Sequence, residues 1–262
     1  RAVHALDTFD WRFFQKGKVV LDEGGKLSFF SFTDGKVLGT SGVEEAREGI
    51  LPHWGASVAG VRRLLDASSW KVRRGVCRLE DDLGKIVGRG DLYLPVKGNA
   101  FFGLRIEPLR GYQRECEDLA GKVAASGSIS GARSFFRELL SFGGRRAGEY
   151  SQSVTLSLSP ELTLPAAYVE LFSYFYAILQ ENRTGILERL DTEFLHDYRV
   201  ALRRLRSATS QMKKDMPPEI YSSLSGELKS LFAATSRARD LDVLALRRVE
   251  YEALLPAELR PG

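Results

Sequence analysis

One stretch of the sequence, residues 191–214, gathers cationic side chains at helical spacing. At about 100° per residue it predicts an amphipathic helix, with Asp191 or Thr192 as its N-cap. Its cations share one stripe, which carries His196, Arg199, Arg203, Arg206 and Lys213, with Lys214 at its margin. Its apolar side chains share the adjoining stripe, which we expect to face the core: Tyr198, Ala201, Leu202, Leu205, Ala208, Thr209 and Met212. Arg204 lies outside the cationic stripe, and we expect it to face solvent.

The spacing of the arginines indicates the chemistry. A rise of about 1.5 Å per residue places Arg199, Arg203 and Arg206 about 6 and then 4.5 Å apart along one line. Guanidinium groups this close repel one another unless an anion lies across them. We therefore expect a ligand that repeats its negative charge, such as a polyphosphate chain. The alternative is that these arginines form salt bridges to neighbouring helices, where Asp240 and Asp242 are the candidate partners.

Further cations extend this set. On the last long helix, Lys229 and Arg239 share an arc with Ser236 and Arg247, and this arc forms a second basic rim if the helices pack side by side. We expect Lys229 and Arg239 to contact the same anion. His196 can donate a hydrogen bond to the same row and gains charge as the pH falls, although a histidine at a helix start is often a packing or capping residue.

Two separated motifs in this half resemble a known family. His196-Asp197-Tyr198-Arg199-Val200-Ala201-Leu202-Arg203-Arg204-Leu205-Arg206-Ser207, then Leu228-Lys229 and Arg239-Asp240-Leu241-Asp242-Val243-Leu244, resemble the first half of a CHAD domain, the conserved-histidine α-helical domain. The resemblance implies a bundle of long antiparallel helices whose basic surface or pore binds inorganic polyphosphate, and association with polyphosphate granules. A CHAD domain has two similar halves, and this sequence stops after the first. The second half is absent by nature, truncated or not included, and these alternatives stay open. If the binding pore needs both halves, we expect this chain to bind weakly or only as a homodimer that rebuilds the second half.

Charge and composition bear on whether nucleic acid or a membrane is the partner. The pI is near 9.0 and the net charge is +4, of which residues 161–262 contribute −1 and residues 1–160 contribute +5. A near-neutral helical half without base-reading or aromatic-stacking motifs disfavours nucleic acid as the ligand. The longest apolar run, 171–179, is too short to cross a bilayer, so we expect no membrane partner. Two cysteines, Cys77 and Cys116, indicate reduced thiols in a cytoplasmic protein.

The sequence does not predict a catalytic centre. It has no phosphate-cradling glycine loop of the Walker type and no defensible Ser-His-Asp set. The three histidines, His4, His53 and His196, are far apart and lack metal-ligand spacing. We therefore expect no metal and no cofactor.

The first part of the chain predicts an antiparallel sheet. Runs of aromatic and β-branched residues separated by turn signals occur at 19–21, 27–32, 70–79, 85–94 and 100–106, with one turn at 97–99. We expect one helix at 59–66 and another after Leu109.

This part resembles the CYTH fold, an antiparallel β-tunnel of triphosphate-processing proteins. The resemblance rests on Leu6-Asp7-Thr8-Phe9-Asp10-Trp11-Arg12, on Val61-Arg62-Arg63-Leu64-Leu65, and on the basic residues of strands 70–79 and 85–94. Active CYTH enzymes carry a Glu-x-Glu-x-Lys strand that is not present here, and strands 19–21 and 27–32 contain no Lys or Arg. We therefore expect no hydrolase activity. The alternative, a metal-dependent triphosphatase or polyphosphatase, requires such a strand upstream of Arg1.

The remaining basic residues of this part have two interpretations. Alternation along a strand points Arg74 and Arg78 to one face, where they could form an anion-binding patch. Otherwise they lie on a solvated face and pair with Glu80 and Asp82. The full basic set is Arg73, Arg74, Arg78, Lys85, Arg89 and Arg105.

Together these patterns predict an α+β protein. Residues 1–118 form an antiparallel β-rich, CYTH-like tunnel or barrel domain, and residues 163–262 form an all-α antiparallel bundle, half of a CHAD domain. Residues 119–162 form a linker with a short helix at 134–142 and an edge strand at 154–158. In the bundle we expect helices at 165–182 and 219–251, with a break at 182–185 after the first.

Overall fold

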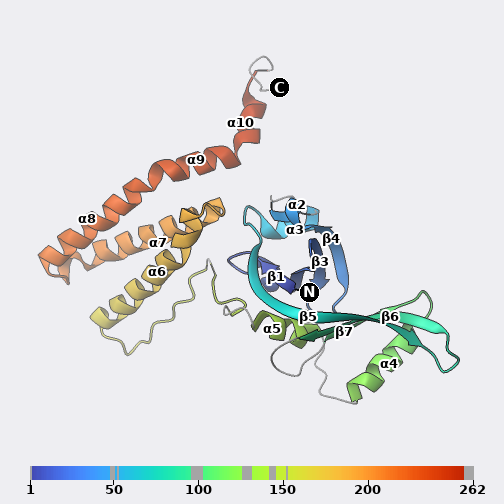
Figure 1. Cartoon of the computed structure of the whole chain (residues 1–262). Coiled ribbons are helices and arrows are strands. Elements are labelled where there is room, and N and C mark those ends of the chain that lie inside the picture. The colour runs from blue at the N-terminus through green and yellow to red at the C-terminus, as the bar shows by residue number, and fades with distance from the viewer. Residues whose placement is uncertain are drawn as a thin grey trace. The chain divides into compact units, whose positions relative to one another are not determined.

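The computed structural model describes residues 2–47, 51, 53–95, 103–125, 132–141, 146–151 and 153–256 (Figure 1). The chain divides into two compact units, Arg1–Ser151 and Gln152–Gly262. The first is built on an antiparallel sheet, and the described regular structure of the second is helical. The α+β class predicted from the sequence is therefore confirmed.

The first unit contains a sheet of seven described strands in the order β4-β3-β2-β1-β5-β6-β7, in which all neighbours are antiparallel. The strands are β1 (Ala2–Asp7), β2 (Lys18–Asp22), β3 (Lys26–Ser31), β4 (Val37–Gly42), β5 (Leu65–Glu80), β6 (Ile86–Pro95) and β7 (Gly103–Pro108). The helices of this unit are α1 (Arg12–Gln15), α2 (Val43–Arg47), α3 (His53–Ala59), α4 (Gln113–Ala125) and α5 (Ala132–Ser141). The long strand β5 joins both parts of the sheet, because its start pairs with β1 and its remainder with β6.

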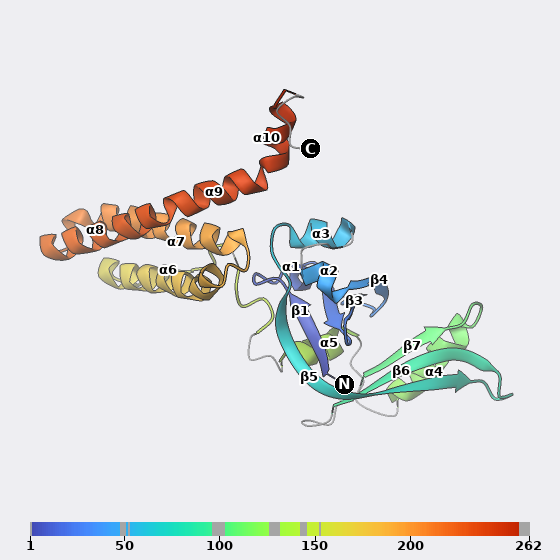
Figure 2. The same ribbon diagram turned by 45° about the horizontal axis from the view of Figure 1, so that its top comes forward.

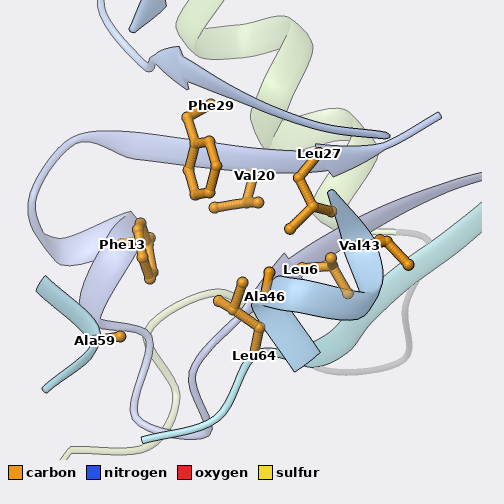
Figure 3. Close-up of a cluster of buried hydrophobic side chains, with 9 residues drawn as sticks. All are labelled: Leu6, Phe13, Val20, Leu27, Phe29, Val43, Ala46, Ala59 and Leu64. Carbon is orange, nitrogen blue, oxygen red and sulfur yellow. The ribbon is translucent and has the colours of Figure 1, made fainter. Parts of the chain in front are cut away.

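A row of apolar side chains across three strands forms the core of this unit. Leu6 lies opposite Val20, and Val20 lies opposite Phe29, so the three side chains share one face. Figure 3 shows these residues with Phe13 of α1 and with apolar residues of α2 and α3, all directed toward one another. Strand alternation therefore supplies the sheet side of the core, and the short helices cover it.

The Leu6–Arg12 motif forms a buried corner after β1. Asp7, only 4% exposed, accepts three hydrogen bonds from the backbone N–H groups that follow it. Asp10 accepts a hydrogen bond from Arg12 Nε at 2.9 Å and forms an ion pair with the buried Arg62 at 3.6 Å. Arg12 also donates to the carbonyl of Ala59, 2.7 Å away. These contacts tie β1 to α1 and α3, so the motif residues stabilise the fold.

Several predictions for this half are wrong. The helix expected at 59–66 instead ends at Ala59, because Gly60 adopts φ of 61° and its N–H closes the last turn on Ala56. Strands β1 and β4 were not predicted, and residues 154–158 form no strand. The turn at 97–99 and the start of the strand at 100–106 lie outside the described residues, whereas the helix after Leu109 is present as α4.

The second unit packs three helices in antiparallel succession. They are α6 (Leu164–Leu187), α7 (Thr192–Gln211) and α8 (Pro218–Ala234); a 3₁₀ turn, η1 (Met212–Lys214), lies between α7 and α8, and α9 (Ser236–Leu246) and α10 (Arg248–Leu254) follow. Both views show α7 beside α6 and α8 (Figures 1 and 2). The core is Phe175, Leu179, Ala201, Leu202, Leu205 and Leu228. Of the predicted apolar stripe, Tyr198 and Met212 are half-buried and the other five residues are buried.

The start of α7 is as predicted, because the carboxylate of Asp191 accepts a hydrogen bond from Glu193 N as an N-cap. The break expected at 182–185 is wrong. The α6 helix continues to Leu187, and Gly185 lies directly against the ring of Phe194, which is 1% exposed. A glycine here lets α6 approach α7 closely.

The long helix expected at 219–251 is divided at Thr235 and Arg247. At the first break the Thr235 hydroxyl donates to the carbonyls of Leu231 and Phe232, and the Ser236 hydroxyl also donates to Phe232. Such bonds compete with the backbone ladder of the helix. Three apolar residues of this segment, Leu231, Leu246 and Val249, are 44%, 45% and 78% exposed.

Replacing Gly185 with Ala should destabilise the helical unit by about 1–3 kcal/mol, because the added Cβ would lie 2.2 Å from a Phe194 ring atom. Urea unfolding followed by far-UV circular dichroism measures this. The matched control is Gly226→Ala on α8, where a Cβ meets no atom within 4 Å among the described residues. That change should raise the stability by up to about 1 kcal/mol. Wild-type stability of Gly185→Ala would contradict the close approach of α6 and α7.

Candidate functional site

The α7 helix sets its cations along its border with α8. Lys213 Nζ lies 5.7 Å from the ring centroid of Tyr221, and the Arg206 and Arg199 Cζ atoms lie 4.9 and 4.0 Å from that of Phe232. Two cations of α7 and Lys213 of the adjoining η1 turn therefore contact two α8 rings, in an order set by the antiparallel packing. Such contacts are each worth about 0.5–2 kcal/mol.

Arg199 connects α7 to the break between α8 and α9. Its Nη1 donates to Phe232 O at 2.9 Å, to Thr235 Oγ1 at 2.8 Å and to Ser236 Oγ at 3.2 Å. These are acceptors at the C-terminal end of α8, where a cation is also favoured by the helix dipole. One face of this guanidinium therefore stabilises the fold.

Arg199 also lies within the field of other cations. Its pKa is lowered by burial; Arg239 and Arg203 lower it further, and Asp240 opposes them. Because Arg239 lowers the pKa of Arg199, it lies close enough to act on it. The α9 helix thus adds a fourth arginine to Arg199, Arg203 and Arg206 of α7. Arg239 is itself held by a hydrogen bond of 3.2 Å from its Nη1 to Thr192 O at the start of α7.

Arg199, Arg203, Arg206 and Arg239, here called the arginine row, form no ion pair with a carboxylate of the described residues. Arg203 is exposed, and it makes no hydrogen bond or ion pair with any residue in the described ranges. No carboxylate of the described residues lies within 4.0 Å of the charged nitrogens of Arg199, Arg206 or Arg239, so Asp240 and Asp242 do not form the salt bridges considered above. Asp240 and Asp242 therefore offset part of the positive charge from a distance, but no carboxylate in the described ranges occupies the guanidinium groups directly.

The other predicted residues lie at varying distances from this row. His196, half-buried, lies one turn before Arg199, and the exposed Lys229 lies one turn before Phe232 on α8. Lys213 and Lys214 lie in η1, two helical turns or about 10 Å past Arg206. The structure thus groups Arg199, Arg203, Arg206 and Arg239 and sets the two lysines of η1 apart.

The aromatic partners of the row were missed by the sequence analysis. Phe232 was not expected to contact α7, and Tyr221 was not singled out. A signal was present, because the two residues are 11 positions apart, about three helical turns, and so lie on one face of α8. Arg204 is exposed as predicted and lies on the opposite border of α7, with its Cζ 5.7 Å from the ring centroid of Phe175 on α6.

The cations of the sheet unit are arranged differently. Arg74 and Arg105 both bind Asp91, at 2.8 and 2.6 Å, and each has a second carboxylate nearby, Glu23 at 3.7 Å and Glu107 at 3.1 Å. The partners expected for Arg74, Glu80 and Asp82, are not the ones observed. This network across β5, β6 and β7 is largely neutralised.

Within the described ranges, no three His, Cys, Asp or Glu side chains group closely enough to hold a metal ion. No helix there is both long and apolar enough to cross a membrane.

Fold and site define the class: an α+β protein whose helical unit carries a row of arginines set on aromatic rings. Residues 170–262 match the family model described as the CHAD domain, which supports the resemblance found in the helical half. No curated protein and no solved structure matches the chain. The CYTH resemblance of the first half stays a prediction.

Replacing Arg199 with Gln should lower the stability of the helical unit by about 1–3 kcal/mol, because three acceptors at the end of α8 lose their charged donor. The matched control is Arg203→Gln, which should stay within about 0.5 kcal/mol of the wild type, since Arg203 is exposed. Far-UV circular dichroism in urea reports on the helices, and fluorescence of the three tryptophans, all in the sheet unit, reports on the other unit. Equal losses in both variants would refute the structural role of Arg199.

Proposed function

We propose that this protein binds inorganic polyphosphate along the arginine row of its helical unit. The observation that carries the proposal is the convergence of Arg199, Arg203, Arg206 and Arg239 without a carboxylate within 4.0 Å among the described residues. Like charges held this close favour an anion that spans them. His196 and Lys229 border the row and would extend it, and Lys213 and Lys214 would hold a longer chain.

The physical basis of binding is electrostatic. Planar guanidinium groups form paired hydrogen bonds with phosphate oxygens, and a polyphosphate chain offers such oxygens repeatedly. Binding releases counterions from the chain, so the affinity should fall steeply as salt rises. The match of residues 170–262 to the CHAD domain supports this ligand, and association with polyphosphate granules would follow from it.

We propose binding without catalysis. Holding a polyanion requires no bond to break, and the arginines Arg74 and Arg105 of the sheet unit already share Asp91. A triphosphatase or polyphosphatase acting through the sheet is the alternative. Release of orthophosphate from tripolyphosphate or polyphosphate in the presence of Mg²⁺ or Mn²⁺ would favour it.

The test is a titration of the full chain with long-chain polyphosphate at about 50 and 200 mM salt, comparing Arg203→Gln with Arg204→Gln. Both variants lose one charge from adjacent, exposed positions of α7, but only Arg203 belongs to the row. Arg203→Gln should weaken binding several-fold and reduce the slope of log K against log salt by about 0.7–0.9. Arg204→Gln should change both much less.

Duplex DNA in the same titration distinguishes a specific site from general attraction to polyanions. The proposal expects polyphosphate to bind more tightly than DNA at both salt concentrations. Equal affinity for the two polymers, or equal losses in both variants, would show that the row is not a dedicated site. No polyphosphate binding at 50 mM salt would refute the proposal for this chain.

The homodimer considered from the sequence also stays a prediction. If two copies are needed to enclose one chain, light scattering should show the mass doubling when polyphosphate is added. A monomer mass in the bound state would exclude that arrangement.

A further inference from the structure

The ring of Phe232 contacts two members of the arginine row at once. The Cζ atoms of Arg199 and Arg206 lie 4.0 and 4.9 Å from its centroid. The two residues are two helical turns apart on α7, so their Cα atoms are separated by about 10 Å. Both side chains therefore lean from different turns of α7 toward one ring on α8.

We infer that Phe232 is a positioning residue that sets the spacing of Arg199 and Arg206 for a chain of linked phosphates. This inference rests on the proposed function of the same row. Phe232 need not touch the ligand, because it acts through the two guanidinium groups that it contacts.

The ring is well placed for this role because its own position is fixed. Phe232 is half-buried and packs against the core cluster of the helical unit. Its ring is therefore less free to move than the ring of an exposed side chain. Its carbonyl accepts hydrogen bonds from Arg199 Nη1, Thr235 Oγ1 and Ser236 Oγ, which fix the end of α8 beneath the ring. One residue thus holds Arg199 through both its ring and its backbone.

An aromatic ring can order two arginines without neutralising them, which a carboxylate cannot do. A carboxylate between two arginines would order them, but it would neutralise the charge that the ligand needs, as Asp91 does for Arg74 and Arg105 in the sheet unit. The π face attracts cations without adding a negative charge. Phe232 therefore orders Arg199 and Arg206 while leaving the row cationic.

This ordering favours a particular ligand class. Immobilising a long side chain on binding is costly, and a side chain that is already ordered avoids most of that cost. A chain of linked phosphates offers oxygens to both guanidinium groups at many positions along its length, whereas orthophosphate offers a single phosphate group. Phe232 should therefore raise the preference for polyphosphate over orthophosphate.

The experiment compares wild type, Phe232→Leu and Phe232→Trp in the full chain, titrated with long-chain polyphosphate and with orthophosphate at several salt concentrations. Phe232→Leu keeps an apolar side chain but removes the π face. It should weaken polyphosphate binding about tenfold and orthophosphate binding by no more than about twofold. Arg206 loses the ring that orders it while Arg199 keeps its hydrogen bonds at the end of α8, so the loss is largest for a ligand that must reach both groups. Phe232→Trp should bind polyphosphate within about twofold of the wild type, since tryptophan offers the strongest π face.

The salt dependence separates positioning from charge. Phe232→Leu removes no cation, so the slope of log K against log salt should match the wild type while the affinity falls; removal of Arg203 should change the slope itself. The control for loss of an aromatic ring is Tyr176→Leu on α6, an exposed ring without a cation over it in the described part of the chain. It should bind both ligands as the wild type does.

Three outcomes would overturn the inference. Wild-type affinity of Phe232→Leu would show that the ring only packs, and failure of a folded Phe232→Trp to restore binding would show that shape, not the π face, matters. Equal fold losses for polyphosphate and orthophosphate would remove the role in spacing. If the wild type does not bind polyphosphate, the proposed function is refuted. If the wild type binds and the Phe232 variants behave as just described, only the positioning role of Phe232 is refuted.

Discussion

The arrangement of the helical unit depends on one constraint: four arginines are held close together without a carboxylate of the described residues bound between them. Arg199, Arg203, Arg206 and Arg239 come from two helices. Burial lowers the pKa of Arg199, Arg239 and Arg203 lower it further, and Asp240 opposes them. The repulsion among the arginines is balanced by uncharged acceptors and by aromatic rings: the carbonyls of Phe232 and Thr192, the hydroxyls of Thr235 and Ser236, and the ring of Phe232. These partners order the cations and leave their charge available.

The break at Thr235 follows from the same arrangement. A continuous helix would bury the carbonyl of Phe232 in its own ladder, whereas here that carbonyl accepts the guanidinium of Arg199 and two side-chain hydroxyls. Beyond the break, Arg239 of α9 donates a hydrogen bond to the carbonyl of Thr192 at the start of α7. The irregular point of the helical unit is thus the point at which its cations converge.

The sheet unit shows the opposite solution to a cluster of cations. Arg74 and Arg105 share the carboxylate of Asp91, and Glu23 and Glu107 lie nearby, so strands β5, β6 and β7 are joined by ion pairs. Charged residues of the Leu6–Arg12 motif are similarly paired with one another and with Arg62 in a buried corner. Charged residues here cross-link a curved sheet, and in the helical unit they remain available for a ligand.

The sequence by itself determined the α+β class, the start and apolar face of α7, and the cationic stripe, because helical periodicity and capping act over a few neighbouring residues. It failed where distant residues decide. Gly185 of α6 packs against the ring of Phe194 on α7, and the end of α8 accepts a hydrogen bond from Arg199, 33 positions before Phe232. Only the tertiary structure brought Phe232 and Arg239 to the α7 row, because the packing of α8 and α9 on α7 sets which side chains meet. Sequence spacing places residues on a face of one helix, and the partner of that face is chosen by packing between helices.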